Sequence, residues 1–254
     1  MELMEYQRGD LVRTLGRSTR VWAGAGNHEV ADEYWFALTG DRDPAFNLAC
    51  CWSASASLLV THCLEPVLSA HEPALIMLAD AALANAQTLI DAGWVNVGAM
   101  PFMMISETGE RFDVSGAVRR LGREELDAAR GLLADAMCIG RSSAAVALPD
   151  SALEHDDIEI YGQFEDDRLV AEVTVVRQDG FAVIWSMATW RDRQGRGHGR
   201  ELLETVLREE LGHGAHASLL SSTRAGEALY RRLGYVAVDH LQVWSRPRWV
   251  LGSS

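Results

Sequence analysis

The sequence predicts an α/β protein built from two related modules. Segments with a helical apolar repeat alternate with short apolar strands along the chain. A polar break with a glycine, Ser106–Arg111, separates two such series of segments. In addition, Ala84–Val97 aligns without a gap on Ala225–Val238 when the sequence is shifted by 141 residues.

The aligned stretches share one order of features: a helix, a glycine, an aromatic residue and an alternating strand. Gly93 falls on Gly234, and Trp94 falls on Tyr235. Two readings stay open at this point. The modules are either related halves, or two units that look alike because helix–glycine–strand connections are common.

Periodicity and strand-forming residues predict each element of the first module. In order, we expect a helix around Leu11–Leu15, strands at Glu33–Leu38 and Asn47–Trp52, a helix at Leu58–Leu68, a strand at Ala74–Leu78, a helix at Ala81–Ala92 and a strand at Trp94–Ile105. Pro66 is expected to bend or end its helix, because proline lacks the backbone N–H donor.

The second module is expected to begin with a helix and to continue with a three-stranded meander. The predicted elements are a helix at Arg123–Cys138, strands at Ile158–Phe164, Leu169–Val176 and Phe181–Trp190, a helix at Glu201–Leu211, a strand at Ala217–Leu220, a helix at Ala225–Leu233 and a strand at Tyr235–Trp244. Asp179-Gly180 predicts a hairpin turn. We therefore expect domains at 1–112 and 113–254.

Composition excludes several classes of protein. The 254 residues carry a formal charge of −13, which argues against nucleic-acid binding. All 23 basic residues are arginine, so no lysine can form a Schiff base. The most apolar stretch, Pro73–Ile90, is too interrupted to span a membrane, and the first ten residues do not resemble a signal peptide. Four cysteines without a CxxC pair favour a reduced, cytoplasmic protein.

A glycine-rich loop between a predicted strand and a predicted helix carries the clearest chemical signal. Three glycines alternate in Gln194–Gly199, and the helix that follows offers unpaired N–H groups. Such a loop can bind an anion. The arginines Arg191, Arg193, Arg196 and Arg200 add local positive charge. The pattern is neither a Walker loop nor a dinucleotide fingerprint.

Two motifs in this module resemble those of GNAT-type N-acetyltransferases. Gln194-x-x-Gly197-x-Gly199 is similar to the loop that holds the pyrophosphate of acetyl-CoA in that family. Ser222–Tyr235 looks like the family's S-x-x-G-x-x-L-Y-x-x-L-G-F segment. The resemblance implies modules with a mixed, mostly antiparallel sheet flanked by helices. It also implies acetyl-CoA as co-substrate and an amine as acceptor.

The resemblance assigns roles to individual residues. It implies that Tyr230 is the general acid that protonates the departing CoA thiolate. The backbone of Met187, Ala188 and Thr189 would bond the pantetheine arm. The remaining residues that it implies for the co-substrate are Gln194, Gly195, Arg196, Gly197, His198, Gly199, Arg200 and Thr223.

Some roles stay open or have a plainer reading. The general base is not identified, and Asp156, Asp157, Glu159, His216 and Asp239 are candidates by rough proximity only. Tyr230 is alternatively a core residue. His213 and His216 lack a third ligand in sequence, so we expect a loop and no metal site. Cys50 and Cys51 are expected to be small strand residues pointing to opposite faces.

The first module lacks the chemical residues of the second. Under the shift, Leu89 replaces Tyr230, and Ser53–Leu58, without glycine or arginine, stands near the loop. This half resembles the degenerate halves of tandem GNAT proteins. We therefore expect one active site per chain, with a homodimer possible. The alternative is a non-catalytic acyl-CoA-binding or sensing protein. The acceptor and the length of the acyl group are not set by the sequence.

Overall fold

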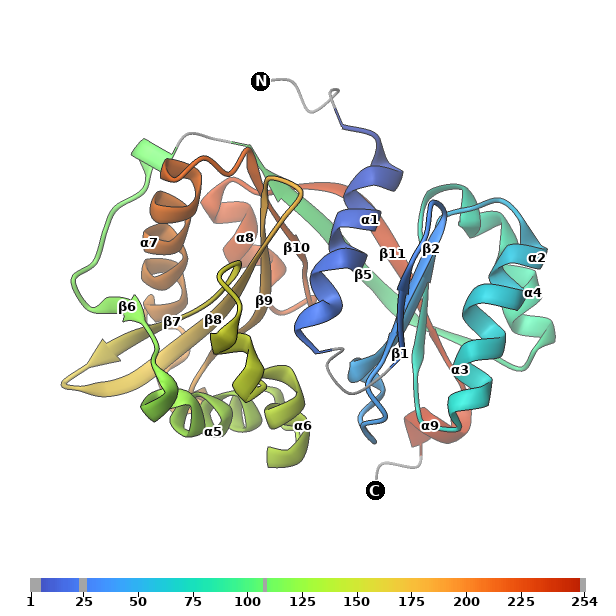
Figure 1. The fold of residues 1–254 in the computed structure, drawn as a ribbon, viewed down its shortest axis with the longest axis horizontal. Helices are drawn as coiled ribbons and strands as arrows, with labels where there is room; N and C mark the ends of the chain where they lie inside the picture. Colours follow the sequence, from blue (N-terminus) through green and yellow to red (C-terminus); the bar gives the residue numbers. More distant parts are fainter. Residues whose placement is uncertain (1–5, 23–26, 107–108, 252–254) are drawn as a thin grey trace. The chain divides into compact units, whose positions relative to one another are not determined.

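The chain forms two units, and neither is a single continuous segment. The first half of the chain contributes a few residues to unit 1, and the C-terminal residues belong to unit 2. The protein is described from a computed structural model, which covers residues 6–22, 27–106 and 109–251 (Figure 1). Unit 1 comprises Met104–Leu220 and Gly226–Val236. Unit 2 comprises the chain up to Met103, Ser221–Ala225, and the chain from Ala237 onward. These units are not the contiguous domains 1–112 and 113–254 expected from the sequence. That division into two related halves of the chain stays a prediction.

Unit 2 is a mixed, mostly antiparallel sheet with helices around it. Its strands run in the order β1 (Asn27–Val30), β2 (Tyr34–Leu38), β3 (Asn47–Cys51), β4 (Leu75–Leu78), β11 (Val236–Ser245) and β5 (Val95–Ile105). Strands β3 and β4 pair in parallel, whereas the pairs β1–β2, β2–β3 and β4–β11 are antiparallel. The helices are α1 (Arg8–Ser18), α2 (Ala56–Leu59), α3 (Glu65–Ala70), α4 (Ala86–Asp91) and α9 (Pro247–Leu251). Strand β1 and helix α9 were not expected from the sequence.

Helix α1 packs closely on the sheet because it carries a glycine at the contact. Leu11, Val12 and Leu15 are buried, as their spacing predicted. A Cβ on Gly16 would lie 2.4 Å from the ring of Trp35, which is completely buried. Glycine therefore sets the distance between this helix and β2.

Pro66 does not end its helix, and the expectation that it bends the helix stays a prediction. The helix runs from α2 through a π-helical turn, Val60–Leu64, into α3 and ends only at Ala70. Pro66 lies in the first turn of α3, directly after the π turn. Proline has no N–H to bond to the carbonyl four residues earlier, and that carbonyl, of His62, lies in the π turn, where the regular α-helical bonding is already changed.

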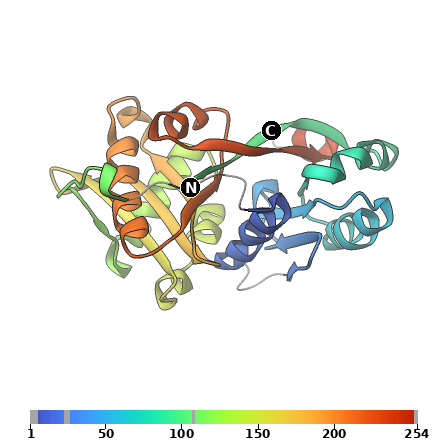
Figure 2. The same cartoon turned by 90° about the horizontal axis from the view of Figure 1, so that it is seen from above.

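Residues of the C-terminal strand complete the core of unit 2. Trp244 is 4% exposed and pairs with Ile76 of β4, and Ser245 donates a hydrogen bond to the carbonyl of Ala74 at 3.1 Å. Trp249 packs edge-on against Trp94, with ring centres 5.3 Å apart. Figure 2 follows β11, in red, to α9. The N-terminal part of the chain therefore depends on residues from the C-terminal end.

Unit 1 is a second mixed sheet, covered by helices on both faces. Its strands run in the order β10 (Ala217–Ser221), β9 (Phe181–Thr189), β8 (Arg168–Gln178), β7 (Ile158–Glu165) and β6 (Val118–Arg120), and residues 104–105 of β5 belong to it. Its helices are α5 (Leu126–Met137), α6 (Arg141–Ala147), α7 (His198–Gly212) and α8 (Glu227–Leu233). The strands and helices predicted for this module are present, and Asp179 and Gly180 form the hairpin turn with positive φ angles.

The expected linker is partly a packed turn. Residues 107–108 lie outside the described residues, and Gly109–Arg111 form a 3₁₀ turn. Gly109 is buried, and a Cβ there would lie 2.8 Å from the backbone oxygen of Arg208 in α7. This end of the break is therefore part of unit 1.

The repeat found in the sequence is also present in the hydrogen bonds. After α4, the amide of Trp94 bonds to the carbonyl of Leu89, and Gly93 has φ 80°. After α8, the amide of Tyr235 bonds to Tyr230, and Gly234 has φ 101°. In both places a left-handed glycine ends the helix and directs the chain into the strand that follows.

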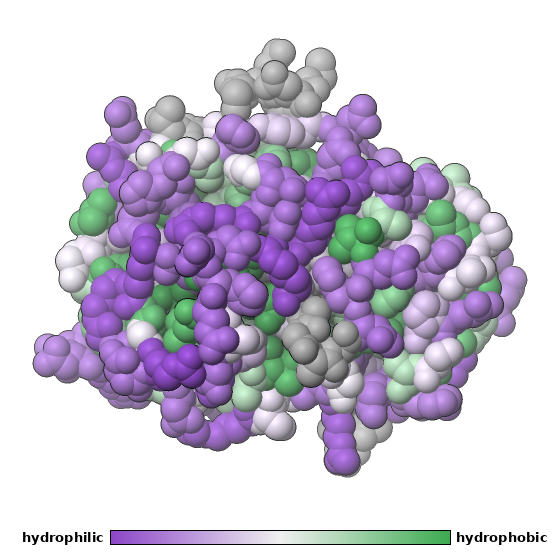
Figure 3. Space-filling view, in the orientation of Figure 1, coloured by the Kyte–Doolittle hydropathy of each residue, from purple (hydrophilic) through white to green (hydrophobic). Residues whose placement is uncertain are grey.

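Among the described residues no single helix is long and apolar enough to cross a bilayer. Arg123–Met137 and Arg141–Glu154 pass only as a pair bent by 113°, and only by length and composition. The face seen in Figure 3 is mainly hydrophilic, with apolar residues in separate spots.

We predict that Trp244→Ala will destabilise unit 2 by about 3–5 kcal/mol, because it leaves a cavity in a packed core. Urea unfolding measured by tryptophan fluorescence and by limited proteolysis of residues 27–103 checks this. Val236→Ala, at a 40%-exposed position of the same strand, is the control and should change stability little. Equal effects of the two substitutions would contradict a core role for Trp244.

Candidate active site

Strands β9 and β10 separate after three residue pairs. Phe181–Val183 pairs in parallel with Ala217–Leu219, and β9 then continues to Thr189 with β8 on its other side. Exposure changes where the strands separate, since Trp185–Met187 are half-buried whereas the preceding residues of β9 are buried. Among the described residues, the peptide groups on the β10 side of this stretch are not paired with β10. They can bond to an extended ligand as they would to another strand.

A β-bulge lies in the separated stretch. Thr174 is opposite Trp185 and Glu172 is opposite Ala188, so β9 has one residue more than β8 between these pairs. Ser186, inside the bulge, has φ 52°, a left-handed conformation that is uncommon outside glycine. Bulges bend a strand and change the direction of its side chains. Here the bulge includes Met187, the first of the residues whose backbone is predicted to bind the pantetheine arm.

The loop after β9 leaves room and free donors for an anion. Gly195 and Gly197 have φ 74° and 96°, and a Cβ at either would meet nothing within 4 Å. Helix α7 begins at His198, and the amides of Arg200 and Glu201 both bond to the carbonyl of Gly197 at 3.0 Å. The amides just before them precede the first helical hydrogen bonds and point out of the helix end.

Most of the positive charge expected around the loop is paired. Arg191 donates to Asp135 through its amide and its guanidinium, and the pKa of Asp135 is lowered by that hydrogen bond. Arg193 pairs with Glu165. Arg200 pairs with Glu204 at 2.9 Å, whereas Arg196 donates a hydrogen bond to the backbone carbonyl of Asp192 at 3.0 Å. Backbone amides, with Arg196, are therefore the main donors that the loop offers to an anion.

The other predicted co-substrate residues differ in their positions. Gln194 donates to the carbonyl of Thr189 at 3.1 Å and so connects the loop to the end of β9. The Nε2 atom of His198 is buried and has no hydrogen-bond partner among the described residues. Gly199 lies against β9, because a Cβ there would be 2.9 Å from the Cε of Met187. Thr223 belongs to Ser221–Ala225, which is part of unit 2.

Tyr230 brings a phenol to the separated part of β9. It lies on α8, is 9% exposed, and its hydroxyl donates to the Sδ of Met187 at 3.6 Å. Burial raises the pKa of Tyr230 to about 12. The phenol therefore keeps its proton at neutral pH and already points at a sulfur atom. Its ring packs edge-on against Tyr235, so a core contact and a hydroxyl aimed at the separated stretch occur together.

The corresponding strands of unit 2 do not separate. Leu48–Cys51 pairs with Leu75–Leu78 along the whole of β4, and the amide of Ala79 continues this pairing to Cys51. Leu89, at the position of Tyr230, is completely buried in the core. Unit 2 therefore has neither the separated strands nor the phenol.

The earlier candidates for the general base that belong to unit 1 have contacts away from Met187. Glu159 pairs with Arg120 at 2.8 Å, and the amide of His216 bonds to Gly180, at the opposite end of β9. Asp156 and Asp157 accept hydrogen bonds from Arg177 near that same end. Asp239 belongs to unit 2. Among the described residues, no three His, Cys, Asp or Glu side chains lie close enough to hold a metal ion.

Sequence reasoning missed Glu172. Its side chain is completely buried on β8, and neither carboxylate oxygen has a hydrogen-bond partner among the described residues. Burial raises the pKa of Glu172 well above its usual range. The available signal was a single acid within the apolar strand Leu169–Val176.

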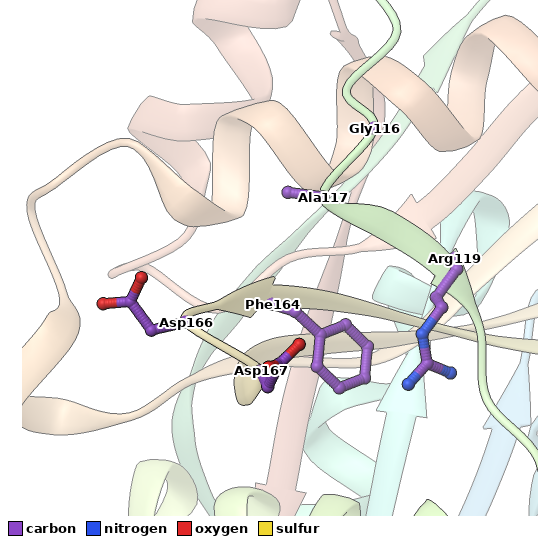
Figure 4. A pocket seen from close by; sticks show the side chains of 6 residues that line it. All are labelled: Gly116, Ala117, Arg119, Phe164, Asp166 and Asp167. Atoms are coloured by element: carbon purple, nitrogen blue, oxygen red, sulfur yellow. The ribbon is translucent and has the colours of Figure 1, made fainter.

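A hollow of about 430 Å³ lies elsewhere in unit 1 (Figure 4). It is lined by Gly116, Ala117, Arg119, Phe164, Asp166 and Asp167. The guanidinium of Arg119 is 4.0 Å from the ring centre of Phe164 and pairs with Glu125 at 2.5 Å. This hollow is beside β6, the end strand of the unit, and none of the predicted site residues lines it.

Comparison with known proteins identifies the class. Residues 156–237 match the family model of the acetyltransferase (GNAT) domain. No curated protein sequence matches the chain. The matched segment, which resembles a GNAT domain, includes the separated strands, the glycine loop and Tyr230.

Solved structures extend the likeness of fold to nearly the whole chain. A GCN5-related N-acetyltransferase from Kribbella flavida is 18% identical, with TM-score 0.66 over 95% of this chain and 97% of that one. A GCN5-related N-acetyltransferase from Sphaerobacter thermophilus is 13% identical, with TM-score 0.62 over 94% and 90%. A putative GNAT-family acetyltransferase from Novosphingobium aromaticivorans is 15% identical, with TM-score 0.57 over 93% and 96%.

We predict that Gly199→Ala will be less stable than Gly212→Ala. Alanine normally stabilises a helix by about 1 kcal/mol relative to glycine. At Gly212, in the same helix, a Cβ meets nothing within 4 Å, so that gain should appear. At Gly199 the new Cβ must displace Met187, which offsets the gain. Chemical unfolding measures both variants, and an equal gain at the two positions would show that Met187 does not pack on this helix start.

Proposed function

We propose that unit 1 transfers an acetyl group from acetyl-CoA to an amine. The observation that supports this most directly is the separation of β9 from β10 beside the Tyr230 hydroxyl and the glycine loop. The loop amides would hold the pyrophosphate, and the unpaired edge of Met187–Thr189 would hold the pantetheine arm. These three features are adjacent in one unit and serve the three parts of one co-substrate.

The chemistry needs no nucleophilic side chain. The amine attacks the thioester carbonyl carbon, a C–N bond forms and the C–S bond breaks. A backbone N–H on the unpaired edge of β9 would stabilise the oxyanion. Tyr230 would give its proton to the departing thiolate, and it remains a phenol at neutral pH because burial raises its pKa to about 12.

One site per chain follows from the difference between the two units. Strands β3 and β4 stay paired, and Leu89 has no proton to give. Unit 2 would thus have a structural role. All four cysteines are free thiols, which fits a reducing compartment such as the cytoplasm. A non-catalytic acyl-CoA-binding protein is the second candidate, because no base lies on the separated strands.

A thiol-release assay with acetyl-CoA and a panel of primary amines tests the proposal. We predict that Tyr230→Phe will lower turnover tenfold or more and leave acetyl-CoA binding nearly unchanged, because only the proton donor is lost. Tyr235→Phe is the matched control, since it removes a buried hydroxyl that bonds to Ser218 at 2.7 Å and should keep turnover. Unchanged turnover in Tyr230→Phe would remove this residue as the acid.

We predict that Gly197→Glu will weaken acetyl-CoA binding at least tenfold in calorimetry. The substitution places a negative charge at the loop and forces a side chain onto a residue with φ 96°. Gly116→Glu, in unit 1 with open space around its Cβ, controls for the added charge. Unweakened binding by Gly197→Glu would contradict the loop assignment.

A further inference from the structure

A short turn between the two halves of the chain contacts both helices of the candidate site. Gly109–Arg111 is a 3₁₀ turn in unit 1. At its first residue, a Cβ on Gly109 would lie 2.8 Å from the backbone oxygen of Arg208 in α7, the helix that begins at the glycine loop. At its last residue, Arg111 reaches α8, the helix that carries Tyr230. The turn therefore links the helix of the loop with the helix of the phenol.

Arg111 completes the C-terminal end of α8. The amide of Tyr235 bonds to the carbonyl of Tyr230 at 3.0 Å and so closes the last turn of the helix. The carbonyl of Leu233 takes no part in this bond, and the Nη2 of Arg111 donates to it at 2.6 Å. A cation at the C-terminus of a helix also interacts favourably with the negative end of the helix dipole.

The guanidinium of Arg111 lies directly against the glycine that ends the helix. A Cβ on Gly234 would be 2.6 Å from the Nη2 atom. Gly234 therefore meets two requirements, a φ of 101° and room for the arginine. The guanidinium carbon also lies 4.9 Å from the ring centre of Phe112, which is 6% exposed. Contact with a buried ring restricts the guanidinium to this position.

The corresponding helix of unit 2 ends in the same way without an arginine on its glycine. After α4, Gly93 has φ 80°, and the amide of Trp94 bonds to Leu89. Among the described residues, nothing lies within 4 Å of a Cβ built on Gly93. The helix end itself therefore forms without such a contact. The arginine lies on the helix that carries the phenol, and the helix that carries Leu89 has no counterpart in the described part of the chain.

Helix α8 depends on outside contacts for its position. It has seven residues, Glu227–Leu233, and its N-cap, Gly226, has no side chain that could cap the first turn. Isolated helices this short are marginal in water, so contacts with the rest of the protein hold them in place. Leu233 follows Tyr230 by three residues, which is less than one turn of helix. A hydrogen bond at Leu233 therefore acts within one turn of the phenol.

The position of the phenol matters for the proposed proton transfer. The hydroxyl of Tyr230 must lie within hydrogen-bond reach of the departing sulfur. It already lies 3.6 Å from the Sδ of Met187 on β9. A displacement of about 1 Å at a reacting group can lower a rate by about a hundredfold. Contacts that fix α8 are therefore expected to affect the rate.

We propose that Arg111 is a positioning residue: through the Leu233 carbonyl it holds α8, and with it the Tyr230 hydroxyl, at the separated stretch of β9. This rests on the proposed function and adds to it a residue from the segment between the two halves. Arg111 is assigned no contact with the co-substrate, and its effect on the reaction passes through Tyr230. Loss of Arg111 should therefore lower kcat and leave the affinity for acetyl-CoA unchanged.

A double-mutant cycle in kcat tests this, using acetyl-CoA and the most active amine of the panel. Arg111→Ala should lower kcat about fivefold or more and leave the KM for acetyl-CoA within about twofold. In the Tyr230→Phe background the same substitution should change kcat by less than about twofold, because the group that Arg111 positions is already lost. Arg111→Lys keeps a charged donor and should restore part of the rate.

Arg130→Ala is the matched control. The Nε of Arg130 donates to the carbonyl of Leu148 at 2.8 Å, directly after α6, a helix of the same unit that carries no predicted site residue. The substitution removes an arginine from a helix end without changing α8, so kcat should stay within about twofold of the wild type. A merely structural loss would lower the rate alike in both variants.

Amide hydrogen exchange, followed by NMR, tests the contact without a substrate. The amides of Gly234 and Tyr235, which close the end of α8, should exchange faster in Arg111→Ala than in the wild type, because local opening there becomes easier. The amides of Gly93 and Trp94 end α4 without an arginine contact and should exchange alike in both proteins. Global unfolding of the variant would instead raise exchange at both helix ends.

The outcomes separate the two proposals. A wild type that transfers acetyl to no amine would overturn the proposed function and this inference with it. An active wild type in which Arg111→Ala lowers kcat by the same factor with and without Tyr230→Phe would overturn the inference alone. An unchanged kcat, or unchanged exchange at Gly234 and Tyr235, would equally overturn it. Where Arg111→Ala does not fold, the same cycle with Arg111→Lys decides between these outcomes.

Discussion

The separation of β9 from β10 after Val183 is the constraint on which the candidate site depends. Up to that point the parallel pairing holds the two strands, and beyond it β9 pairs with β8 and, among the described residues, no longer with β10. The other features of the candidate site lie in or next to the stretch of β9 that is separated from β10. The bulge at Ser186 lies in the separated stretch, the glycine loop follows its end, and Tyr230 reaches Met187 within it. If β9 and β10 stayed paired, the glycine loop would be an ordinary connection between a strand and a helix.

Unit 2 shows that outcome within the same chain. Its β3 and β4 remain paired to their ends, and a helix follows directly, with Ser55 accepting a hydrogen bond from the amide of Leu58 as a side-chain cap. The helix ends match more closely than the sites do. Both halves use a left-handed glycine and the same pair of backbone bonds to enter their last strands. The two halves thus share the geometry of the helix end although they differ in the residues proposed for chemistry. A glycine cap is needed to pack the helix on the strand whether or not a ligand binds.

Much of the fold could be predicted because apolar periodicity reports burial. The spacing of Leu11, Val12 and Leu15 indicated the buried face of α1, and the sequence around Gly93 and Gly234 indicated both helix ends. The glycine loop was recognisable because its requirement is local: positive φ and open space at Gly195 and Gly197.

Other features depend on partners that sequence does not reveal. An alternating strand shows which residues are buried, but not that β11 pairs with β4. The arginines of the loop suggested free charge, yet Asp135 and Glu165 pair with two of them from distant positions. Glu172 appeared to be one polar residue in a strand, and only the surrounding elements show that both of its oxygens are enclosed.

Strand β11, which comes from the C-terminal end of the chain and completes unit 2, sets an order of assembly. The bond between Ser245 and Ala74 spans 171 residues, so a chain made from its amino end has β1 to β4 long before it has β11. Closing so long a loop costs entropy before Trp244 enters the core, and until then β4 has an open, hydrogen-bonding edge. The unit whose residues are synthesised first is therefore completed last, after the ribosome has made the strands that carry the candidate site.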